Sequence, residues 1–125
     1  MRVLFVVLLI AHLLMETMAA VALIGGPGGI SAAGQGAQWS MHYGFAALAM
    51  ASVSLWVWPR RNDLAAVTVA LGLLVTFHVG LTLSLAVAGD QVGGMIGHAV
   101  LAAISLLLIT QRTRFLDRGT RLSHE

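Results

Sequence analysis

Cysteine is absent from this 125-residue chain, which excludes both a disulfide framework and a thiolate metal site. Lysine is absent as well, so arginine alone supplies the positive charge. Charged residues make up 10% of the chain and hydrophobic residues 58%, whereas a soluble domain is about a quarter charged and about half apolar. The mean hydropathy is +0.90. We therefore predict an integral membrane protein, and we assign the basic charge to membrane topology instead of to nucleic-acid binding.

Four apolar stretches are long enough to cross a bilayer, which takes roughly 20 residues of helix. They cover residues 3–24, 38–58, 64–88 and 91–110. A glycine-rich segment, a Pro-Arg-Arg-Asn turn and a Gly-Asp turn separate them, and connections this short predict antiparallel neighbours. The expected fold is all-α: an up-down four-helix bundle in the membrane over residues 1–111, followed by a cytoplasmic tail at 112–125.

The arginines all fall on one side of this predicted topology. They are Arg2, Arg60, Arg61, Arg112, Arg114, Arg118 and Arg121. Because positively charged loops stay in the cytoplasm, both termini are predicted to be cytoplasmic, in the cell (inner) membrane. The tail is then expected to lie beside anionic lipid.

Each predicted span carries one histidine, and the two halves of the chain resemble each other around these residues. In the first and third spans an Ala-Val-Ala triplet follows His12 and His78 by eight residues. In the second and fourth spans an Ala-Ala pair follows His42 and His98 by four residues. The pattern predicts a tandem repeat of two helical hairpins, in which diagonal helices pair His12 with His78 and His42 with His98.

Ionisable side chains inside a membrane span usually face the protein interior and mark a functional site. Diagonal helices in a bundle lie about 12–14 Å apart, given neighbours at about 8–10 Å, so two inward imidazoles can ligate one haem iron from both sides. Such an iron has no open position and transfers electrons. The preferred ligands are His42 and His98. The room for a porphyrin would come from Gly44, Gly94 and Gly97, although close helix packing explains such glycines equally well.

The residues around these two histidines resemble one four-helix half of a haem A synthase. The matching segments are the Gly-Gly-Pro-Gly-Gly loop, Trp-Ser-Met-His42-Tyr-Gly-Phe and Gly-His98-Ala-Val-Leu. The resemblance implies a b-type haem on His42 and His98. From the bis-histidine ligation itself, the first hypothesis is electron transfer or quinone-linked redox chemistry. The family's Glu-x-x-His-Arg motif reads Trp39-Ser-Met-His42-Tyr43 here, so the resemblance concerns haem ligation and not haem A synthesis. The full synthase has eight helices, which two copies of this chain would supply as a homodimer. The chain is also similar to small four-helix membrane proteins of unknown function.

The second pair, His12 and His78, leaves several roles open. Glu16 lies one turn after His12, where its carboxylate could orient the imidazole or form a proton relay with it. This pair is expected to contact the haem propionates, a quinone or a proton path. A quinone or a redox partner protein is the expected partner of the chain. Methionines near the histidines suit copper as an alternative cofactor, and a copper- or zinc-handling protein is the second hypothesis. A third hypothesis is a non-catalytic subunit of a membrane complex, whose histidines only hydrogen-bond between helices.

Overall fold

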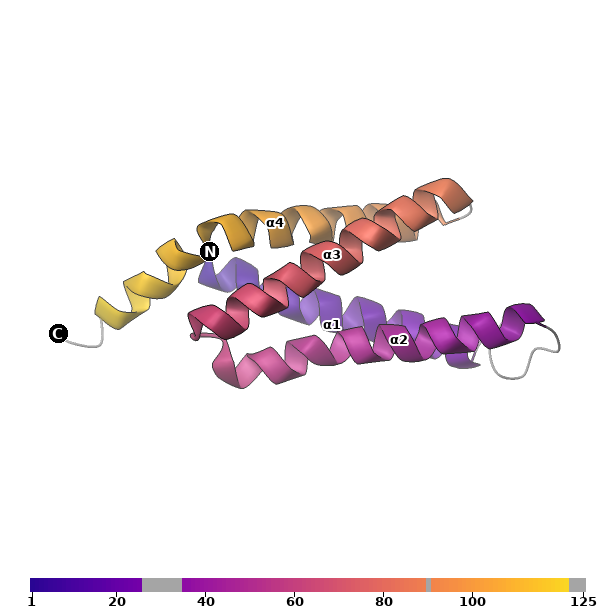
Figure 1. The fold of residues 1–125 in the computed structure, drawn as a ribbon, viewed down its shortest axis with the longest axis horizontal. Helices are drawn as coiled ribbons and strands as arrows, with labels where there is room; N and C mark the ends of the chain where they lie inside the picture. The colour runs from indigo at the N-terminus through magenta and orange to yellow at the C-terminus, as the bar shows by residue number, and fades with distance from the viewer. Residues whose placement is uncertain (26–34, 90, 122–125) are drawn as a thin grey trace. The chain divides into compact units, whose positions relative to one another are not determined.

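The computed structural model describes residues 1–25, 35–89 and 91–121. Over these residues helix is the only regular secondary structure and there is no strand, which confirms the all-α prediction. The elements are α1 (Arg2–Gly25), α2 (Gln35–Val57), the 3-10 turn η1 (Trp58–Arg60), α3 (Leu64–Ala88) and α4 (Val92–Arg121), as drawn in Figure 1. Four helices in this described part of the chain are long and apolar enough to span a membrane.

The predicted spans agree with the helices to within three residues at most ends, and α3 matches at both. The fourth span is the exception, because α4 continues past residue 110 to Arg121 and takes in most of the predicted tail. Polar residues end the apolar run there, but no glycine or proline interrupts the backbone before Gly119. The glycine-rich loop at 26–34, Asp90 and tail residues 122–125 lie outside the described residues.

The described chain divides into two compact units. The α1–α2 unit comprises Leu9–Trp58, and the α3–α4 unit comprises Met1–Leu8 together with the chain from Pro59 onward. Each unit contains one antiparallel pair of helices, so each can be described by itself.

Three side chains fix the register of the α1–α2 unit. The Ser54 hydroxyl donates to the Leu9 carbonyl oxygen at 2.9 Å, and the Ser40 hydroxyl donates to the Leu23 carbonyl oxygen at 3.4 Å. His12 bonds to α2 between these two points. α1 and α2 are therefore antiparallel, as the sequence predicts for neighbouring spans.

Capping interactions define both ends of α3. The Asp63 carboxylate caps α3 by accepting from the amides of Ala65 and Ala66 at 2.8 and 3.1 Å. Gly89 ends α3 with φ of 73°, the left-handed conformation that favours glycine, and its amide donates to the Leu85 carbonyl oxygen. After that turn α4 returns alongside α3 (Figure 1).

Candidate functional site

Two histidines meet inside the α3–α4 unit. His78 lies in the middle of α3 and His98 in the second turn of α4, and both side chains are buried. Their Nδ1 atoms are 2.9 Å apart, and their rings lie 5.1 Å apart with a 37° tilt. The Phe77 ring places an edge against both imidazoles, at centroid distances of 5.3 and 6.2 Å. The Phe77 ring thus forms an aromatic wall beside the pair.

The short Nδ1–Nδ1 distance allows two chemical states. In the first, one Nδ1–H donates to the other Nδ1, so the pair holds a proton between its rings. In the second, a metal ion replaces that proton. Ligands at about 2.0–2.1 Å from an ion are about 2.9 Å apart at right angles, about 3.3 Å apart in a tetrahedron and about 4 Å apart on opposite sides. The observed distance fits adjacent ligands of one ion, and it is too short for the opposite faces of a haem.

His12 is the buried histidine of the α1–α2 unit. Its Nε2 lies 2.8 Å from the Met50 carbonyl oxygen of α2. A carbonyl oxygen only accepts, so Nε2 carries a proton, and in the neutral form of the ring the lone pair is then on Nδ1. Metal-ligating histidines commonly donate their other ring N–H to a backbone carbonyl in this way. The same bond is also what the structural hypothesis expects of a histidine between two helices.

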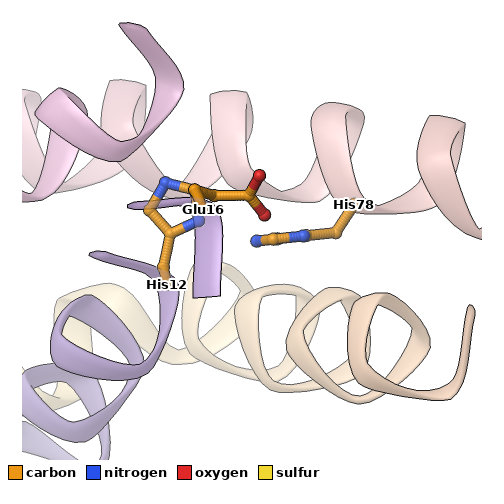
Figure 2. Close-up of side chains that lie close together, drawn as sticks. All are labelled: His12, Glu16 and His78. Atoms are coloured by element: carbon orange, nitrogen blue, oxygen red, sulfur yellow. The ribbon is translucent and has the colours of Figure 1, made fainter. Parts of the chain in front are cut away.

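Glu16 lies one turn after His12 on α1 and is also fully buried. Figure 2 shows these two side chains on α1, and each offers a ligand atom within 4.8 Å of the other. An imidazole and a carboxylate at this spacing can chelate one ion from a single helix face. The α1–α2 unit therefore contains its own pair of ligating groups, formed by His12 and Glu16.

His42, a preferred haem ligand from the sequence, lies in the second turn of α2. Its side chain is exposed and makes an edge contact with Trp39 at 6.1 Å between ring centroids. The other preferred ligand, His98, is buried against His78 in the α3–α4 unit. The predicted pairs of His42 with His98 and of His12 with His78 each join the two units, and both stay predictions.

The three glycines proposed to make room for a porphyrin differ in how closely other residues pack against them. At Gly44 an added Cβ would meet Ile24 at 2.6 Å, so α1 and α2 approach closely there. At Gly94 the nearest contact, Leu85, is 3.4 Å away, an ordinary distance. Gly97 directly precedes His98 on α4. Close packing accounts for Gly44, while Gly94 and Gly97 adjoin the histidine pair along α4.

Pairing histidines by the repeat missed the His78–His98 contact. The available signal was hairpin register: the midpoint between the two positions is residue 88, directly before the Gly89 turn, so an antiparallel hairpin brings them to nearly the same level. The repeat, in contrast, relates residues in equivalent helices and carries no information about contacts inside a hairpin.

No protein-family model, no curated protein and no solved structure matches this chain. What can be inferred about function therefore comes from the two buried ligand pairs, His78 with His98 and His12 with Glu16.

Proposed function

We propose that this chain is a multi-pass protein of the cell (inner) membrane that binds a transition-metal ion through buried imidazoles. The observation that carries the proposal is the His78–His98 pair, whose Nδ1 atoms lie 2.9 Å apart inside an apolar helical hairpin. Both termini are proposed to be cytoplasmic, with the two hairpins forming a tandem repeat.

The surfaces of the helices support insertion in a membrane. Large apolar side chains are exposed along α3 and along α4 as far as Leu107; they include Val69, Leu73, Leu83, Val87, Ile96 and Val100. Val87 is 90% exposed, an arrangement that water penalises and lipid favours. Arginine, meanwhile, is confined to the ends of the helices on one predicted side.

The ligand types favour zinc or copper(II). Imidazole nitrogen suits both ions, and the absence of cysteine removes the thiolate ligands that favour copper(I). Two imidazoles do not complete a coordination shell. In the α1–α2 unit, His12 and Glu16 form a separate pair of groups that could bind an ion of its own.

A b-type haem on His42 and His98 is the second candidate, and the resemblance to haem A synthase favours it. That arrangement requires the two ligating nitrogens to stand about 4 Å apart across the iron. His98 would have to turn away from His78 to supply one of them. His78 is therefore a ligand only in the metal-site proposal, and His42 is a ligand only in the haem proposal.

The test is the metal content and absorption spectrum of the protein purified in detergent from cells supplied with zinc, copper and haem precursor. The metal-site proposal predicts about one equivalent of zinc or copper per chain and no Soret band. His78→Gln should lower the metal affinity by about tenfold or more, while His42→Gln should leave it unchanged.

Glutamine keeps a similar size and a hydrogen-bonding group, and far-ultraviolet circular dichroism would report any loss of helix. A Soret band that His42→Gln abolishes would support haem and reject the metal site. Absence of both metal and haem would reject both candidates.

A further inference from the structure

A small cleft lies in the α3–α4 unit, at the arginine-bearing ends of the helices. It has a volume of about 260 Å³ and is lined by Arg2, Phe5, Val6, Arg61 and Asn62. Phe5 is buried and Val6 half-buried, whereas Arg2, Arg61 and Asn62 are exposed. The cleft therefore has an apolar wall from the start of α1 and a polar rim from the turn before α3.

The rim is positively charged. Two guanidinium groups and one amide line the cleft, and none of these described lining residues is acidic. The nearest carboxylate along the chain, that of Asp63, accepts the two amide bonds that cap α3. Arg2 is held in place by a hydrogen bond from its Nη2 to the Leu116 carbonyl oxygen at 3.2 Å. A guanidinium carries five N–H donors, so one bonded to a carbonyl can also bind a phosphate.

We propose that this cleft binds the phosphodiester group of an anionic phospholipid. The combination of an arginine rim with an apolar wall matches the chemistry of a lipid at the membrane–water boundary, where the headgroup is charged and the glycerol backbone meets the acyl chains. Free phosphate would use the rim alone and gain nothing from Phe5 and Val6. The inference rests on the membrane location in the proposed function, and it is independent of the metal site.

The chain offers a matched pair of variants to test the cleft. Arg60 and Arg61 are neighbours, both exposed, and carry the same charge, but Arg61 lines the cleft and Arg60 does not. Phosphatidylglycerol would be titrated into the detergent-solubilised full chain, and lipid binding followed by native mass spectrometry. Arg61→Gln should weaken phosphatidylglycerol binding by about tenfold, the effect of losing a hydrogen bond to a charged group. Arg60→Gln should leave the affinity unchanged, and circular dichroism should show both variants folded.

Three results would overturn the assignment. Equal weakening by Arg60→Gln and Arg61→Gln would indicate attraction of lipid to the general positive charge. Equal binding of phosphatidylcholine would remove the preference for an anionic lipid. Displacement of phosphatidylglycerol by an equal concentration of inorganic phosphate would identify the ligand as free phosphate. Extraction of the protein from membranes by alkaline carbonate, measured in parallel, would instead reject the membrane location itself.

Discussion

Replacement of Gly44 by alanine tests how closely α1 and α2 pack. An alanine Cβ at this position would lie 2.6 Å from Cγ1 of Ile24, 3.1 Å from Cβ of Leu23 and 3.3 Å from the Ala20 carbonyl oxygen. The first of these atoms can move by rotating a side chain, but the other two move only with the helix backbone. The two helices must therefore separate or slide to accommodate one methyl group.

Two opposing effects set the magnitude. Alanine favours a helix over glycine by about 1 kcal/mol, while overpacking a tight contact costs about 1–3 kcal/mol. Because two of the three close approaches are to atoms whose positions the backbone fixes, we expect the upper part of that range. The net result is a loss of about 1–2 kcal/mol in the free energy of unfolding, measured by denaturant titration in detergent.

Gly80 supplies the control, since an added Cβ there meets nothing within 4 Å. Gly80→Ala should be neutral or stabilising by up to about 1 kcal/mol, through helix propensity alone. The reasoning would be refuted if Gly44→Ala stabilised the protein as much as Gly80→Ala, because the close approach of α1 and α2 would then be absent.

Three further predictions concern stability and topology. Ser54→Ala removes the 2.9 Å hydrogen bond to α1 and should cost about 1 kcal/mol of unfolding free energy. The Ser52 hydroxyl bonds within α2 at an exposed site, so the control Ser52→Ala should cost almost nothing. Asp63→Ala should cost about 0.5–2 kcal/mol by removing the α3 cap, and Asp63→Asn should recover most of the loss; equal effects in the same titration would contradict the cap. Because the chain has no cysteine, a single introduced cysteine reports topology without labelling of any native cysteine. An impermeant maleimide should label Gln91→Cys in intact cells and Thr113→Cys only after lysis, and the reverse pattern would invert the proposed orientation.

Length, hydropathy and local signals predicted the helices well. Asp63 and Gly89 are strong N-cap and C-cap residues, and α3 begins directly after the first and ends directly before the second. The end of α4 was harder to predict, because apolar content identifies a membrane span but does not stop a helix. No glycine or proline lies between Thr110 and Gly119, so α4 continues after its apolar run has ended.

The candidate site was predicted only in part. Ionisable groups in a span are expected to face the protein interior, and His12, His78 and His98 are buried whereas His42 is exposed. The contact between His78 and His98 was missed, because it depends on which face each helix turns inward. These helices are apolar all round, so no polar stripe marks the outer face. The hairpin register gives the level of each histidine, while its rotation about the helix axis is fixed by side-chain packing.

The most direct test of the metal site is the X-ray absorption spectrum of the metal bound to the purified wild-type protein. The account predicts a shell of nitrogen and oxygen ligands at about 2.0–2.1 Å, with the outer-shell scattering that imidazole rings produce. His78→Gln should reduce the imidazole contribution, and His42→Gln should leave it unchanged. A bound metal whose spectrum lacks imidazole scattering, or is the same in the wild type and in His78→Gln, would contradict the central claim.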